Sequence, residues 1–130
     1  MAAFYTPAEV SERSGFSLDT LRYYEKIGLL TGVARDGAGR RRFSDRDLDW
    51  LHMLRCLRDT GMPIAEMLRY AELVREGEHT VAERRDLLER HDRRVSERID
   101  LLCRQRERIQ RKIGLYYRDT AGLAGEPVSA

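Results

Sequence analysis

The chain has 130 residues, of which 42% are hydrophobic and 35% charged, enough for one ordinary domain or for one small domain with an extended element. Its 24 basic and 22 acidic residues nearly balance, so net charge alone barely favours an anionic partner. No apolar stretch approaches the roughly 20 residues needed to span a bilayer, and the N-terminus lacks the pattern of a secretion signal. Two cysteines do not make a disulfide framework. We therefore expect a cytoplasmic protein with no membrane partner.

Two short helices are predicted at the N-terminus, each with a capping residue before it and a glycine after it. Thr6 and Glu9 have the spacing of a capping box, with proline at the first helical position, and this helix ends at Gly15. Ser17 caps the second helix, which ends at Gly28. The second helix carries one arginine and two adjacent tyrosines, side chains that form hydrogen bonds.

A loop rich in glycine and arginine follows over residues 31–43, and we predict that it contains two short strands. We call this segment the wing. Its positive charge is concentrated, because the only acidic residue near its arginines is Asp36. A helix with hydrogen-bonding side chains followed by a basic loop is what a winged helix needs to bind a DNA duplex: the helix reaches base edges and the loop holds phosphates. The arginines are Arg35, Arg40, Arg41 and Arg42.

Two more helices are predicted before residue 77. Ser44 caps the first, which runs to about Thr60, and Pro63 begins the second, which runs to about Arg75. Together with the N-terminal helices and the wing they can share one small core. The candidate core residues are Val10, Leu18, Leu21, Leu48, Leu51, Leu54, Leu57 and Met67.

A long helix is predicted from Thr80 to Tyr117, about 57 Å at 1.5 Å per residue. Apolar residues recur in it every seven positions, the pattern of a coiled-coil seam, although Arg85, Asp92 and Arg106 interrupt the second row. The chain has no second helix of matching length to cover this stripe, so we predict a homodimer. The expected seam residues are Val81, Leu88, Val95, Ile99, Leu102, Ile109, Ile113 and Tyr116.

Several segments, in this order, resemble the DNA-binding domain of MerR-type bacterial transcription regulators: Tyr5–Val10, Thr20–Leu30, Gly39–Phe43 and Ser44–Leu48. The resemblance runs from about residue 4 to residue 71, and the long helix also fits. It implies a mainly all-α fold: a winged helix-turn-helix domain over residues 1–76, then an antiparallel coiled-coil dimerisation helix over residues 77–118. We expect residues 119–130 to be a disordered tail. Where the family usually has an aromatic residue after the wing glycines, this chain has Arg40.

The resemblance implies a regulator that binds a palindromic promoter operator and bends and untwists its spacer for RNA polymerase. Arginine can bind guanine or phosphate with two hydrogen bonds, and a tyrosine hydroxyl can bind a backbone oxygen. One of two adjacent tyrosines must point away from the duplex, and we favour Tyr24 as partly core. The expected DNA contacts are Ser17, Thr20, Arg22, Tyr23, Tyr24, Arg41, Arg42 and Arg58.

The absence of particular residues argues against several kinds of sensor. The metal-sensing and iron–sulfur members of the family need cysteines that are absent after Cys103, and the drug-binding members carry a large further domain. We therefore expect no metal and no cofactor. We also expect no enzymatic activity, because the three histidines lack a nucleophile–base pattern.

The segment Leu54–Pro63, with parts of residues 70–83, resembles the NmlR/AdhR-like branch of the family, whose members respond to reactive aldehydes through one cysteine in the third helix. This resemblance assigns sensing to Cys56. Helical geometry places Cys56 off the apolar face, beside His52 and Asp49, whereas a buried structural cysteine would sit on the apolar side. Cys103 is expected to be incidental. Two alternatives stay open: a small ligand in a dimer crevice, and a coiled-coil module that binds other proteins.

Overall fold

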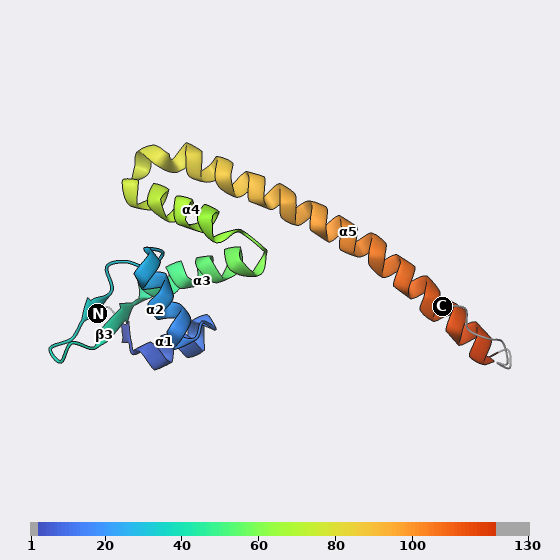
Figure 1. The fold of residues 1–130 in the computed structure, drawn as a ribbon, viewed down its shortest axis with the longest axis horizontal. Helices are drawn as coiled ribbons and strands as arrows, with labels where there is room; N and C mark the ends of the chain where they lie inside the picture. Colours follow the sequence, from blue (N-terminus) through green and yellow to red (C-terminus); the bar gives the residue numbers. More distant parts are fainter. Residues whose placement is uncertain (1–2, 122–130) are drawn as a thin grey trace. The chain divides into compact units, whose positions relative to one another are not determined.

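The computed structural model describes residues 3–121, and most of them are helical (Figure 1). The N-terminal helix-turn-helix with a wing and the long helix that follows confirm the predicted fold class. Within the described range, no helix is long and apolar enough to cross a membrane. The elements are β1 (Phe4–Tyr5), α1 (Pro7–Ser14), α2 (Leu18–Ile27), β2 (Ala34–Arg35), β3 (Arg41–Ser44), α3 (Asp45–Asp59), α4 (Ile64–Glu76), the short 3-10 helix η1 (Glu78–Thr80) and α5 (Val81–Ala121).

The first three helices begin at the predicted capping residues. Thr6 Oγ1 accepts a hydrogen bond from the Glu9 backbone N–H at 3.2 Å, and the Glu9 carboxylate accepts one from the Thr6 N–H at 3.0 Å. These bonds to Thr6 lower the pKa of Glu9. Ser44 and Asp47 make the same reciprocal pair before α3. Helix α2 ends at Gly28, whose φ of +89° suits a residue without a side chain.

Three short strands form one antiparallel sheet in the order β1-β3-β2. The two strands of the wing were expected, but β1 was not, because two residues are too few for an alternating pattern. Strand β1 places Tyr5 opposite Phe43, and β2 places Arg35 opposite Arg41. The sheet therefore ties the N-terminus of the chain to the wing.

The hydrophobic core contains seven of the eight residues that the sequence predicted for it. The prediction was wrong for Leu18, which is 41% exposed because it is the first residue of α2 and lies at the surface. Sequence periodicity missed several buried residues that lie in turns and strands rather than on helices. These are Phe16, Leu29, Leu30 and Phe43.

The chain divides into two compact units, residues 1–91 and residues 92–130. This boundary lies well after the expected one at residue 76, because Leu87 and His91 of α5 are buried in the first unit. Helix α5 continues through Gly114 to Ala121. Residues 119–121, which we expected to belong to the tail, are thus helical, and the rest of the expected tail, residues 122–130, lies outside the described part of the chain.

Candidate DNA-binding surface

The turn between α1 and α2 is held from both sides. Arg55 of α3 donates a hydrogen bond from Nη1 to the Gly15 carbonyl at 2.7 Å. Gly15 has φ +78°, and a Cβ there would collide with this guanidinium. On the other side Phe16 is buried and meets the Tyr24 ring edge-on, with 5.1 Å between ring centroids. Helix α2 is thus set at a fixed angle to α1, which is the geometry of a helix-turn-helix.

Of the arginine and two adjacent tyrosines on α2, two side chains face solvent. Tyr23 is half exposed, and Arg22 is exposed with only a loose ion pair to Asp19 at 3.5 Å. Tyr24 is 3% exposed and packs in the core, in agreement with our expectation that it is partly a core residue. Its inclusion among the DNA contacts is corrected, because a buried side chain offers no surface to a duplex.

Ser17 and Thr20 form the N-terminal cap of α2. The Ser17 hydroxyl accepts a hydrogen bond from the Thr20 N–H at 3.1 Å and donates one to Thr20 Oγ1 at 2.9 Å. Both residues are at the helix end where the backbone dipole is positive, which favours a phosphate. Arg58 of α3 is close to this end, because its guanidinium lies 5.2 Å from the centroid of the Phe16 ring.

The tip of the wing is shaped by Asp36. Its Oδ1 accepts hydrogen bonds from the backbone N–H groups of Ala38 and Arg40, both at 2.9 Å. The bond from the Arg40 N–H is the main reason that the pKa of Asp36 is lowered. The Arg35 guanidinium donates to the Gly39 carbonyl at 2.8 Å. The turn is therefore ordered by the chain itself.

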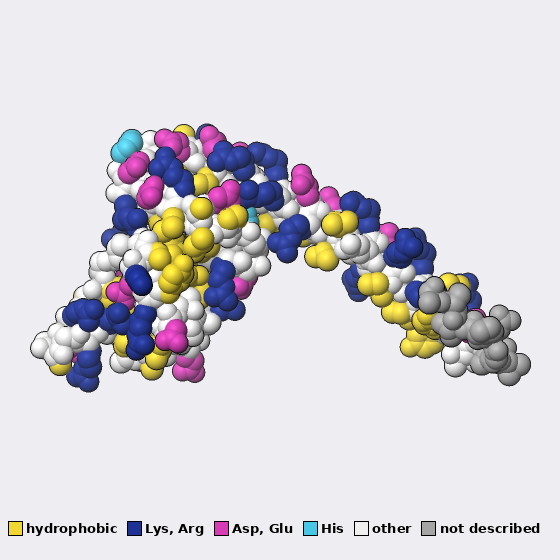
Figure 2. Space-filling view, in the orientation of Figure 1, with side chains coloured by type: hydrophobic (Ala, Val, Ile, Leu, Met, Phe, Trp, Pro, Cys, Tyr) yellow, Lys and Arg dark blue, Asp and Glu magenta, His cyan; other side chains and the backbone are white. Residues whose placement is uncertain are grey.

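The wing arginines differ in what they contact. Arg41 of β3 forms an ion pair with Glu25 of α2 at 2.5 Å, and both side chains are about three-quarters buried. Arg42 lies over the ring of Phe4 in β1, with 4.1 Å from its guanidinium carbon to the ring centroid. Arg40 stays exposed beside Asp36. Figure 2 shows basic side chains gathered over this part of the first unit.

Cys56 is exposed on α3, off the apolar face as expected, and Cys103 of α5 is exposed as well. Two basic residues of α3 close to Cys56 in sequence, His52 and Arg55, have other partners. Arg55 donates to Asp59 and to Gly15, and His52 Nε2 lies 3.3 Å from the Arg13 carbonyl oxygen. Among residues 3–121 no cluster of three or more His, Cys, Asp or Glu residues could hold a metal ion.

A helix-turn-helix with an exposed arginine and tyrosine on its second helix, followed by a basic wing, defines a winged helix-turn-helix protein. Residues 5–73 match the MerR HTH family of regulatory proteins, and residues 48–112 match the "MerR, DNA binding" family. The chain belongs to the MerR family, which confirms the resemblance noted in the sequence. Members of this family are transcriptional regulators, not enzymes.

Individual relatives agree with this assignment. An uncharacterized HTH-type transcriptional regulator of Haemophilus influenzae is 48% identical over 85 residues, which is 65% of this chain and 63% of the relative. The regulator AdhR of Bacillus subtilis is 36% identical over 81 residues, 62% of this chain and 58% of AdhR. The matches thus span less than two thirds of these relatives. The crystal structure of HiNmlR, a MerR family regulator lacking the sensor domain and bound to promoter DNA, superposes with a TM-score of 0.83 at 40% identity, covering 92% of this chain and 94% of HiNmlR.

Proposed function

We propose that this MerR-type regulator binds a palindromic promoter operator as a homodimer, reading bases with α2 and holding phosphates with the wing and the end of α3. The observation that carries the proposal is the exposure of Arg22 and Tyr23 on a helix that Arg55 and Phe16 fix in place. The relative HiNmlR, of the same fold, was crystallised with promoter DNA. A protein-docking module would have no use for this arrangement of arginine and tyrosine.

The contacts divide into reading and anchoring roles. Arg22 and Tyr23 point into solvent from the middle of α2 and are the residues we assign to base edges and the adjacent backbone. Ser17, Thr20 and Arg58 lie near the positive end of α2, where a phosphate is favoured. We assign these three side chains, together with Arg42 of the wing, to phosphate contacts that anchor the protein on DNA.

Arg41 has a competing partner within the chain. Its ion pair with Glu25 joins β3 to α2, so we propose that Arg41 mainly sets the position of the wing relative to the reading helix. The expected phosphate contact of Arg41 would have to share this guanidinium with Glu25. Arg42 has no carboxylate partner in the described part of the chain and is the better candidate for a phosphate.

The homodimer is supported by the exposed stripe of α5. Leu88 and Val95 are partly covered within the chain, but from residue 99 onward the seam lies open, and Leu102 is 60% exposed (Figure 2). A helix with one apolar stripe and charged flanks is stable when a partner buries that stripe. A second copy provides a stripe of the same length. The exposed seam residues are Val81, Ile99, Leu102, Ile109, Ile113 and Tyr116.

Charge favours the antiparallel arrangement of the two helices. Residues 98–118, the distal half of α5, contain seven arginine or lysine residues and only two acidic ones. In a parallel pair these basic halves would face each other and repel. In an antiparallel pair each basic half faces the first half of the partner helix, residues 81–97, where five acidic and five basic residues balance.

We further propose that the regulator acts on a promoter with an overlong spacer, which it bends and untwists so that RNA polymerase can engage. The support for this step is membership of the MerR family. Bending a site costs energy that additional protein contacts must offset. The phosphate anchors at α2, the wing and α3 are spread over three elements, which suits a protein that holds deformed DNA.

The signal that we propose is a reactive aldehyde, sensed by Cys56. A thiolate adds to the aldehyde carbonyl carbon, forming a C–S bond, and the carbonyl oxygen takes up a proton, so no oxidant is required. The exposed position of Cys56 allows this reaction. Its backbone carbonyl accepts a hydrogen bond from Thr60, which links the site to the end of α3. The alternative is a small ligand in a dimer crevice, with Cys56 inert.

DNA binding is tested by measuring affinity for the chain's operator and for random DNA across a series of salt concentrations. Arg42→Ala should weaken both and reduce the salt slope by about one unit, since one phosphate contact is lost. Arg22→Ala should cost about 1–3 kcal/mol on the operator and relax its sequence preference. Arg41→Ala should weaken binding with little change in slope, because it displaces the wing.

Arg111→Ala on the exposed distal half of α5 is the control and should bind like the unmutated chain. Equal small losses from Arg22→Ala and Arg42→Ala on both DNAs would contradict the division into reading and anchoring residues. Complete absence of operator binding by the unmutated dimer would contradict the proposed function and favour a protein-interaction module.

A further inference from the structure

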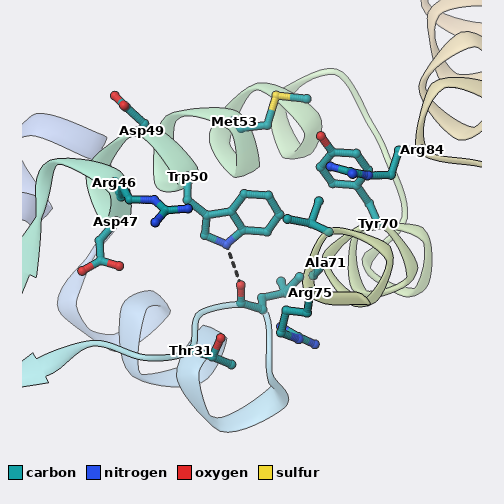
Figure 3. A pocket seen from close by; sticks show the side chains of 12 residues that line it. Thr31, Arg46, Asp47, Asp49, Trp50, Met53, Tyr70, Ala71, Arg75 and Arg84 are labelled. Carbon is teal, nitrogen blue, oxygen red and sulfur yellow. Dashed lines mark hydrogen bonds between the residues drawn. The ribbon is translucent and has the colours of Figure 1, made fainter. Parts of the chain in front are cut away.

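A pocket of about 560 Å³ opens between α3 and α4 in the first unit, closed at one end by the residues that follow α2 (Figure 3). Its volume falls in the range of about 300–1,000 Å³ that is typical of small-molecule sites. Its lining includes neither Cys56 nor any residue assigned above to DNA. The DNA-binding proposal leaves it without a role.

The pocket has a rigid aromatic wall. The rings of Trp50 and Tyr70 are stacked, with 5.8 Å between centroids and 12° between planes. The indole N–H of Trp50 donates to the Leu29 carbonyl at 2.7 Å, which fixes the ring orientation and satisfies its one donor. Met53 extends the apolar surface beside it. Such a wall can stack against a planar ring of a ligand without rearranging.

Three arginines lie around this wall. Arg75 donates to the Gly28 carbonyl at 2.7 Å and Arg84 donates to the Gly77 carbonyl at 3.2 Å, so both are held by neutral groups. The buried Nε of Arg84 has no hydrogen-bond partner among the described residues. Within residues 3–121, Arg46 has no ion pair, and Figure 3 shows its guanidinium pointing toward the indole.

The two acidic residues of the lining do not neutralise these arginines. Asp47 accepts the hydrogen bond from the Ser44 N–H that caps α3. In Figure 3 the carboxylates of Asp47 and Asp49 both point away from the indole. The pocket therefore offers an aromatic face and guanidinium groups without carboxylate partners, and their N–H donors suit a carboxylate or phosphate.

We propose that this pocket binds a small aromatic anion, with its ring against Trp50 and Tyr70 and its charge beside Arg46, Arg75 and Arg84. Charge argues against a second copy of the chain as the occupant. The exposed helix that a copy could insert is the distal half of α5, with seven basic and two acidic residues, which the three arginines repel.

Trp50 is the only tryptophan of the chain, so its fluorescence reports on the pocket directly. The test titrates the full chain, without DNA, with 4-nitrobenzoate, 4-nitrophenyl phosphate and the neutral 4-nitrobenzamide. Nitroaromatic rings quench tryptophan on contact, and N-acetyltryptophanamide corrects for light absorption. We expect saturable quenching by at least one anion, with binding about tenfold tighter than that of the amide, since a charge-assisted hydrogen bond is lost in the neutral compound.

Arg46→Gln should weaken anion binding about tenfold without affecting the fold, because Arg46 has no ion pair to lose among the described residues. Arg75→Gln should also weaken it, and circular dichroism checks its folding. Arg111→Gln, on the distal half of α5, is the control and should bind as before. Equal binding of anion and amide, no saturable quenching, or unchanged binding in both pocket variants would each overturn the proposal. Quenching that appears only when the chain is diluted to monomer would place a second copy in the pocket, and would also overturn it.

Discussion

The hydroxyl of Thr60 joins three parts of the first unit at the end of α3. Thr60 Oγ1 donates to the Cys56 carbonyl oxygen at 2.7 Å and lies 2.7 Å from Nε2 of His91, which is buried on α5. A hydroxyl has one proton, so donation to the carbonyl leaves the oxygen to accept from His91 Nε2–H. In the proposed sensing by Cys56, this side chain is the contact that would carry a change in α3 to His91 of α5.

Thr60→Val keeps the shape of the side chain but removes these bonds. We expect the free energy of unfolding to fall by about 1–3 kcal/mol, the usual effect of removing one partner of a buried hydrogen bond. The measurement is urea denaturation at fixed protein concentration. Thr120→Val is the matched control: Thr120 Oγ1 bonds the Tyr116 carbonyl on an exposed part of α5, so its effect should stay within about 0.5 kcal/mol. Equal effects of the two variants would contradict a structural role for the bond to His91.

Cys56 and Cys103 offer a second matched pair, since both thiols are exposed. An aldehyde adduct on Cys56 adds bulk and polarity one turn before the joint between α3 and α4, close to Arg58. The adduct can act as a switch if it favours one of two dimer arrangements by about 1–3 kcal/mol. Cys56→Ser should keep dimerisation and promoter binding but lose induction by formaldehyde or methylglyoxal in a reporter assay. Cys103→Ser should be induced normally. Normal induction of Cys56→Ser would make the small-ligand alternative the better explanation.

At the scale of elements, helix starts are set by local capping signals. The Ser44–Asp47 capping box begins α3, which carries the pocket wall, Arg55, Cys56 and Arg58. Ser44→Ala should lower the free energy of unfolding by about 0.5–2 kcal/mol, because a backbone N–H loses its acceptor. Ser96→Ala, inside the exposed part of α5, should be neutral or slightly stabilising, because alanine has the higher helix propensity. Thermal unfolding of both variants measures the difference.

The sequence predicted what depends on neighbouring residues and missed what depends on distant ones. Capping residues and terminal glycines lie within a few positions of the helices they bound, so α1 to α4 were placed to within one or two residues. Strand β1 exists only because β3, about 40 residues later, pairs with it. The helix α5 passed residue 118 because residues 115–121 contain no proline or glycine to stop it.

The same distinction between neighbouring and distant residues applies to the candidate DNA-binding surface. The exposure of Tyr23 and the burial of Tyr24 follow from helical geometry and could be anticipated. The partners of Arg41 and Arg55 could not, because Glu25 and Gly15 are far from them along the chain. A basic cluster in a sequence therefore indicates where charge is concentrated, while the structure shows which arginines are already paired.

For the whole molecule, helix α5 has two roles along its length. Leu87 and His91 are buried in the first unit, whereas Ile99, Leu102 and the later seam residues are exposed. Helix α5 therefore contributes to the core of the first unit and also carries the exposed stripe that we assign to the proposed dimer. Burying the exposed stripe against a copy removes apolar surface from water at about 25 cal/mol per Å², which is the main stabilising term we expect for the dimer.

Leu102 and Leu101 test this directly, because both are exposed in the single chain but only Leu102 belongs to the seam. On an ideal helix Leu101 points about 100° away from Leu102. Leu102→Asp places a carboxylate in the seam and should dissociate or unfold the protein, whereas Leu101→Asp makes the same change of size and charge outside the seam and should leave the dimer intact. Sedimentation equilibrium measures the mass of each species, and the melting temperature of the unmutated chain should rise with its concentration. A folded, stable monomer of the unmutated chain would remove the basis for the dimer, and dissociation by both variants alike would show that the contact is not confined to the seam.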